Sequence, residues 1–110
     1  MVTYADFERI EMRVGRIVRV ESFPEARKPA YRLWIDFGEP LGVKKSSAQI
    51  TKLYETDTLV GTQVIAVTNL PPRQVANFIS EVLVLGVVLD DGEVALIRPD
   101  REVPLGKRIL

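Results

Sequence analysis

The stretch MRVGRIVRV, residues 12–20, changes its pattern at a glycine, and this change decides the fold. Its apolar residues mark one face of a strand: Met12, Val14, Val18 and Val20. Such alternation with polar residues is typical of a half-buried β-strand. Arg16 interrupts the alternation directly after Gly15, and a glycine beside such a break is typical of a β-bulge or a tight bend. We therefore expect a strongly curved first strand.

The following segments predict further strands. Residues 31–38, YRLWIDFG, alternate cleanly and predict an inward set of four residues: Tyr31, Leu33, Ile35 and Phe37. On the opposite face, Trp34 is predicted to be a partly covered surface aromatic or part of an interface. We expect a short third strand at residues 41–45. The runs QVIAVT and VLVLGVVL are predicted to be core strands, and the second forms a hairpin with EVALIRP through the DDG turn.

Two short helices are predicted from their capping residues. Thr3 is a plausible N-cap with Asp6 three residues later, and apolar residues follow at helical spacing. Ser46 and Gln49 have the S-x-x-Q form of a capping box, which predicts a helix between the third and fourth strands. Curved strands with one such helix favour a small Greek-key barrel of the OB type. A β-sandwich is the competing topology, and either fits a single domain over residues 1–110.

Composition excludes several classes of chemistry. The chain has no His and no Cys, so it lacks an imidazole base, a thiol nucleophile and the usual zinc or haem ligands. We expect no catalytic residues, no metal site and no cofactor. The formal net charge is zero, so any binding of nucleic acid must come from local clustering of cations. No segment has the pattern of a membrane span or a signal peptide, which predicts a cytoplasmic protein.

The stretch NLPPRQVANFISE, residues 69–81, joins two strongly apolar runs and is predicted to be a polar, stiff loop. Pro71 and Pro72 cannot donate to a strand ladder, so they should stop the preceding strand and expose the residues after them. Arg73 then presents a fork of donors that suits a carboxylate or a phosphate. Asn69 is predicted either to fix the turn or to contact a ligand.

Three separated motifs resemble the tRNA-binding domain family. They are MRVGRIVRVESFPEARKPAYRLWIDFG, VIAVTNLPPRQVANFISEVLVLG and SSAQIT, and the likeness spans residues 4–110. The Ser-Ser-Ala-Gln form is that of the CsaA branch. The resemblance implies an OB-fold barrel with dimerising extensions at both termini and a twofold homodimer. One departure concerns Val82 and Leu83, which stand where many relatives have Gly-Met.

The resemblance also implies a binding face, built from the KKSSAQ turn and the NLPPR…SE segment. The candidate ligand-binding residues are Lys44, Ser46, Ser47, Gln49, Asn69, Pro71, Arg73 and Ser80. Ser46 and Ser47 at a helix start would offer hydroxyls beside free N–H groups. Only one of Lys44 and Lys45 can face the groove, since they alternate on a strand, and Glu81 is predicted to tie the loop down. The candidate dimer residues are Phe7, Ile10, Val103, Leu105 and Ile109.

Three functions compete at this point. The first is a dimeric, non-enzymatic chaperone of protein export that binds unfolded polypeptide or preprotein in a groove, with the export machinery as a possible partner. The second is structure-dependent tRNA binding through the same face. A hydrolase or transferase is disfavoured because His and Cys are missing.

Overall fold

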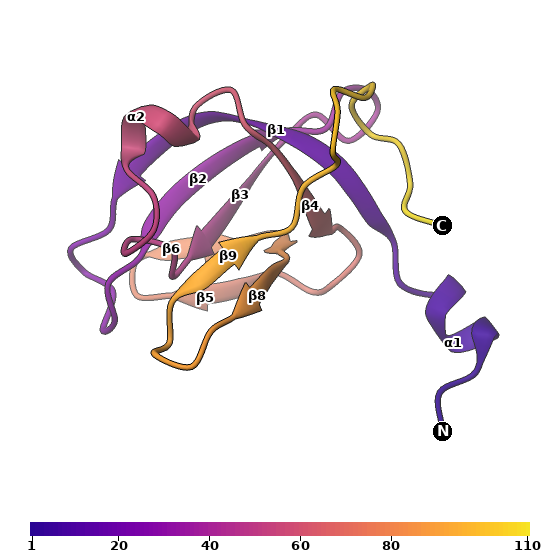
Figure 1. Ribbon diagram of the computed structural model, residues 1–110, viewed down its shortest axis with the longest axis horizontal. Helices are drawn as coiled ribbons and strands as arrows, with labels where there is room; N and C mark the ends of the chain where they lie inside the picture. Colours follow the sequence, from indigo (N-terminus) through magenta and orange to yellow (C-terminus); the bar gives the residue numbers. More distant parts are fainter.

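Five antiparallel strands form a nearly closed OB-fold barrel in the structure, a computed structural model that describes residues 1–110 (Figure 1). Their order in the sheet is β3 (Val43–Ala48), β2 (Tyr31–Asp36), β1 (Met12–Ser22), β4 (Gln63–Val67) and β7 (Leu83–Val84). The two edge strands meet where the backbone N–H groups of Glu81 and Val82 donate to the Lys45 carbonyl, at 2.7 and 3.3 Å. The predicted barrel is therefore confirmed.

β1 is curved as expected, but the irregularity in its pairing lies further along the strand than predicted, and not directly beside Gly15. Its register against β2 shifts between Ile17 and Arg19. In consequence Ile17 is fully buried and Val18 is 44% exposed, so the prediction that Val18 faces inward was wrong. Gly15 serves close packing, because a Cβ there would lie 2.5 Å from the Ile35 side chain.

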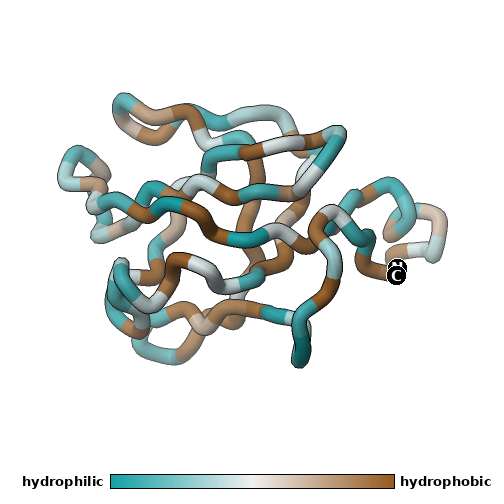
Figure 2. The backbone as a smooth tube through the Cα atoms, turned by 90° about the horizontal axis from the view of Figure 1, so that it is seen from above, coloured by the Kyte–Doolittle hydropathy of each residue, from teal (hydrophilic) through white to brown (hydrophobic).

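The barrel interior follows the predicted alternation of β2. Leu33, Ile35 and Phe37 are all fully buried, and every residue of β4 is buried. Figure 2 shows apolar and polar segments alternating along the strands. This core is continuous across β1, β2 and β4, which is what a closed barrel needs.

The helix between the third and fourth strands begins later than predicted. Ser46 and Gln49 do not cap a helix: β3 continues through Ala48, and its pairing with β2 runs from Val43 to Ala48. Ser46 is 1% exposed and opposite Leu33, so the ladder and the core outweigh its capping tendency. The helix is α2 (Thr56–Leu59), which places Leu59 in the core.

The segment predicted as a loop after Asn69 is a hairpin. β5 (Arg73–Val75) pairs with β6 (Phe78–Ser80) around a two-residue turn in which Ala76 has φ +51°. The downstream run is a core strand only in its first part, where Val82 is buried in the core and β7 belongs to the barrel sheet. β8 (Gly86–Val88) forms a predicted hairpin with β9 (Val94–Leu96), but Val87 and Val88 are 52% and 74% exposed.

Both termini extend the barrel. Helix α1 (Tyr4–Glu8) has the predicted Thr3–Asp6 capping box, yet it buries none of its residues and stands away from the barrel (Figure 1). The C-terminal tail lies along β1, where Gly106 donates to the Val14 carbonyl and Ile109 to that of Met12, both at 2.8 Å. No helix has the length and apolar character that crossing a membrane requires.

Amides at the two ends of β4 hold these extensions. Asn69 accepts from the Glu11 N–H at 3.0 Å and donates to the Arg9 carbonyl at 2.7 Å. Gln63 does the same for one residue of the tail, with the N–H of Val103 at 3.1 Å and its carbonyl at 2.7 Å. Each side chain thus replaces a rung of a strand ladder.

Candidate binding groove on the outer face of the barrel

The outer face of β1, β2 and β3 carries two cross-strand rows of polar and aromatic side chains. In the first row Arg19 is opposite Trp34, which is opposite Lys45; the second row consists of Glu21, Arg32 and Ser47. Because side chains alternate along a strand, Lys45 and Ser47 share this outer face. Lys44 and Ser46 are on the other side of β3, opposite Ile35 and Leu33.

An aromatic cluster covers the middle of this face. Phe78 of the hairpin packs edge-on against Trp34 and Phe23, with ring centroids 5.8 and 5.6 Å apart. Cations lie over the rings: the Arg19 guanidinium carbon is 4.5 Å from the Trp34 centroid, and the Lys45 Nζ is 5.2 Å from that of Phe78. Trp34 is therefore a partly covered surface aromatic.

Hydrogen bonds fix the base of the hairpin to β3. The Lys45 N–H donates to Glu81 Oε1 at 3.0 Å, and the Ser47 N–H donates to Ser80 Oγ at 3.1 Å. These side chains satisfy backbone donors at the edge of β3. Glu81 ties the segment down as predicted, and the hairpin is held as a wall rather than left as a loose loop.

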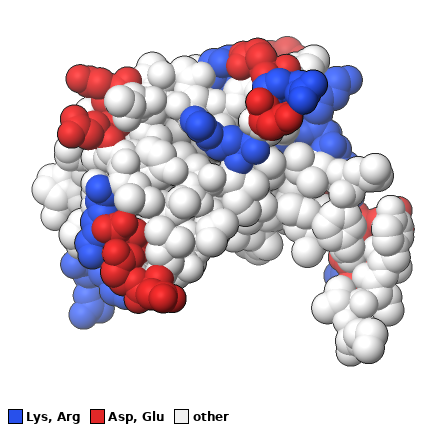
Figure 3. All heavy atoms as spheres, viewed as in Figure 1, with Lys and Arg blue, Asp and Glu red and all other residues white.

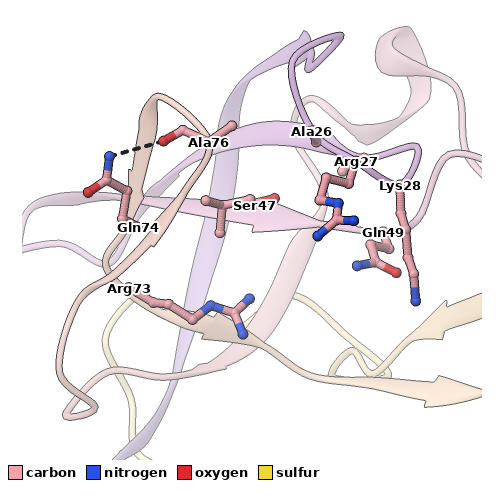
Figure 4. Close-up of a pocket in the computed structure, with 10 residues that line it drawn as sticks. Ala26, Arg27, Lys28, Ser47, Gln49, Arg73, Gln74 and Ala76 are labelled. Carbon is pink, nitrogen blue, oxygen red and sulfur yellow. Dashed lines mark hydrogen bonds between the residues drawn. The ribbon is translucent and has the colours of Figure 1, made fainter.

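A groove of about 770 Å³ separates this wall from the loop at residues 23–30. Its charged residues are all cations, Arg27, Lys28 and Arg73, and no carboxylate lines it. In Figure 4, Arg73 and Arg27 reach into the groove from opposite sides. The apolar lining is small, mainly alanine. This composition suits a polar, anionic ligand.

A second hollow of about 170 Å³ adjoins the groove and shares Ser47 and Arg73 with it. Leu70, Pro71 and Leu83 supply exposed apolar surface there, and Glu81 supplies a carboxylate. The two cavities form one surface with a cationic part and an apolar part.

The structure brings together five of the eight predicted ligand-binding residues. Ser47, Gln49 and Arg73 line the groove, and Pro71 and Ser80 line the adjoining hollow. The remaining three, Lys44, Ser46 and Asn69, line neither cavity.

Arg27, Lys28 and Gln74 also line the groove and were missed. The two cations lie in the proline-bounded segment PEARKPA. Two adjacent cations in a loop are a signal that could have indicated them.

The predicted dimer residues lie in the two terminal extensions and line neither cavity. Phe7 and Ile109 line a hollow between α1 and the tail, Ile10 is exposed, and Val103 and Leu105 are half-buried in the tail. Figure 3 shows mainly uncharged atoms over the N-terminal extension. Nearby, a hydrogen bond from Arg13 lowers the pKa of Glu11 from its ordinary value.

Comparison with known proteins gives one family. The sequence profile described as "Putative tRNA binding domain" matches residues 12–108. The chain is 38% identical over 109 residues to a methionine–tRNA ligase of Thermococcus onnurineus. The aligned region is 98% of this chain and 14% of the ligase. The chain thus spans a small part of the curated relatives that it matches.

Two solved structures superpose on the whole length of this chain. The chaperone CsaA from Bacillus anthracis superposes with a TM-score of 0.95 at 52% identity, covering 100% of this chain and 99% of that one. The CsaA chaperone protein from Picrophilus torridus gives 0.93 at 55% identity, with 100% of both chains covered.

Proposed function

Since the chain belongs to the family of tRNA-binding domains, we propose that it is a non-catalytic protein that binds tRNA in the groove between the 23–30 loop and the β5–β6 hairpin. The observation that carries this proposal is the lining of the groove, which has three cations and no carboxylate in a chain of zero net charge. The groove also lies over β3 between two loops, where OB-folds bind oligonucleotides.

A second candidate function is a chaperone that holds extended polypeptide in the same groove. It is favoured by the likeness to two CsaA chaperones over the full chain, and by the exposed apolar side chains of Leu70 and Leu83 beside the groove. In that role the protein would act in the cytoplasm on preproteins and would meet the export machinery.

Salt dependence separates the two functions. Labelled tRNA and a labelled unfolded polypeptide are titrated in parallel from low to moderate salt. Binding of tRNA should weaken steeply with salt: the logarithm of the association constant should fall against the logarithm of the salt concentration with a slope of about 0.7–0.9 per phosphate contact. Binding through apolar burial should change little. Tight polypeptide binding without tRNA binding at physiological salt would contradict the tRNA proposal.

Charge reversal tests the groove itself. Arg73 is exposed and has no ion pair within the chain, so Arg73→Glu should leave folding intact. We expect it to weaken tRNA binding on the order of tenfold or more, because it replaces attraction to phosphate by repulsion. Arg98→Glu makes the same change of net charge outside the groove and should cost much less. Equal losses in both variants would remove the groove from the site.

We further propose that two copies associate through α1 and the tail. The supporting observation is that α1 buries none of its residues, while Tyr4, Ile10 and Leu110 expose apolar surface around it. Ile10→Glu should shift the protein to monomer in sedimentation velocity, and Val60→Glu, at an exposed apolar site beside α2, should not. Unchanged sedimentation of Ile10→Glu would exclude this interface.

A further inference from the structure

The hollow beside the groove, between Leu70 and Leu83, differs from the groove in size and lining. Its volume of about 170 Å³, against about 770 Å³ for the groove, leaves room for a single ring system rather than for a length of chain. Leu70 and Leu83 form its apolar walls and remain 46% and 48% exposed. These two side chains line one hollow and so offer a joint apolar surface to a ligand.

The aromatic residues on this side of the barrel cannot serve as a platform for unpaired bases. Stacking on exposed aromatic rings is the usual way in which OB-folds hold single-stranded nucleic acid. Here Phe78 and Phe23 are buried, and the ring of Trp34 lies beneath Arg19 and against Phe78. A base that reaches this side must therefore find another apolar surface, and the hollow supplies one.

Polar groups at the hollow are free to read the edge of a base. Glu81 Oε1 accepts from the Lys45 N–H, but its Oε2 has no hydrogen bond within the chain. The Ser47 hydroxyl is likewise unengaged, since only the Ser47 backbone bonds to Ser80. Carboxylates accept from exocyclic amino groups of bases. Arg73 stands on the shared wall, where the phosphate of the same nucleotide would lie.

We propose that this hollow binds one unpaired nucleobase that carries an exocyclic amino group, next to phosphates held by the groove. The inference rests on the proposed RNA binding and deepens it. Leu70, Pro71 and Leu83 enclose the flat faces of the base, Glu81 accepts from its amino group, and Arg73 pairs with its phosphate. An aliphatic side chain of a peptide is a poorer occupant, because it offers no donor to the free carboxylate oxygen of Glu81.

The test uses two labelled RNAs, a short blunt duplex and the same duplex with one bulged guanosine. Fluorescence anisotropy should show that the native protein prefers the bulged RNA on the order of tenfold. Leu83→Trp fills the hollow and should abolish this preference without changing the affinity for the blunt duplex. Val87→Trp, at an equally exposed position on β8 (52%), should retain the preference.

The outcomes are distinct. A preference that survives in Leu83→Trp, or equal binding of the two RNAs by the native protein, overturns the subsite while the proposed RNA binding stands. Binding of neither RNA overturns the proposed function, and the subsite with it. A loss of affinity for unfolded polypeptide alone in Leu83→Trp would assign the hollow to a peptide and contradict the proposal.

Two further variants complete the test. Leu70→Trp narrows the hollow from the loop side, so it should act as Leu83→Trp does, even if Leu83→Trp misfolds by circular dichroism. A bulged uridine lacks an exocyclic amino group and should bind more weakly than the bulged guanosine. Equal binding of the two bulges would overturn the assigned role of Glu81.

Discussion

The two flanks of the barrel are completed in opposite ways. On the groove flank, the β5–β6 hairpin is held by the Ser80 and Glu81 side chains, which accept from backbone N–H groups of β3, and by Phe78, which packs into a small aromatic core with Phe23. On the terminal flank, the Asn69 amide ties the residues after α1 to the barrel, and α1 buries none of its residues.

The hairpin and the terminal extension, both additions to the five-stranded barrel, therefore expose different kinds of surface. The hairpin packs Phe78 within the chain and leaves Arg73 exposed beside the groove. The terminal extension uses hydrogen bonds within the chain and leaves apolar residues exposed. Exposed apolar surface of this kind favours a protein partner. Each flank can be changed without direct contact to the other, which makes the contrast testable.

The largest effect is expected from Phe78→Ala, which removes the centre of the groove flank. Loss of this buried ring should lower the free energy of unfolding by about 3 kcal/mol, measured by urea denaturation. Its neighbour Ile79 is exposed on the other side of β6, so Ile79→Ala should cost less than about 1 kcal/mol. Equal costs would mean that the aromatic cluster does not hold the hairpin.

Asn69→Ala tests the terminal flank. The loss of two hydrogen bonds should cost about 1–2 kcal/mol and should raise amide hydrogen exchange in residues 4–11. The exposed turn residue Asn77 is the matched control, and Asn77→Ala should leave the exchange unchanged. We expect tRNA affinity to stay within about twofold in both variants. A tenfold loss in Asn69→Ala would instead support direct contact of this amide with the ligand.

A smaller gain is expected from Ala76→Gly in the turn of the hairpin. Relief of the left-handed conformation of Ala76 is worth about 1–2 kcal/mol, and the added freedom of glycine costs about 0.5–1 kcal/mol. The free energy of unfolding should therefore rise by about 0.5 kcal/mol. Ala48→Gly, within β3, should instead destabilise the protein, and a gain there would contradict the explanation.

The smallest effect concerns pH on the terminal flank. The pKa of Glu11 lies below its ordinary value of 4.5, chiefly because Arg13 donates a hydrogen bond to its carboxylate. The stabilisation of the folded protein by this ion pair is therefore complete above pH 4.5 and disappears as the pH falls through the lowered pKa of Glu11. Thermal unfolding should show a difference between the native protein and Glu11→Gln at neutral pH, and this difference should close in acid. A gap that persists in acid would exclude this carboxylate as its cause.

The barrel could be predicted because its strongest patterns are local. The alternation from Tyr31 to Phe37 and the capping box of Thr3 and Asp6 both hold in the structure. The S-x-x-Q pattern at Ser46 misled for the opposite reason: the pairing of β3 with β2 is a long-range interaction that no local window contains. The position of the bulge in β1 likewise depends on its two neighbours, β2 and β4.

The groove could be predicted only in part. Arg73 and Gln49 were found because their motifs are distinctive, whereas Arg27 and Lys28 joined them only when the 23–30 loop folded against the hairpin. The choice between Lys44 and Lys45 required the register with Trp34. Asn69 was predicted either to fix the turn or to contact a ligand, and its amide bonds to Arg9 and Glu11, residues that no spacing rule connects to it.

Trp34 gives the protein an optical probe of its own. It is the single tryptophan of the chain, and its indole lies under the Arg19 guanidinium and against Phe78, the residue that anchors the groove wall. Indole emission responds to nearby charge and to exposure to solvent. A ligand that moves the hairpin, or draws Arg19 away, should therefore change the colour and intensity of the emission, so that occupancy can be followed without any attached dye.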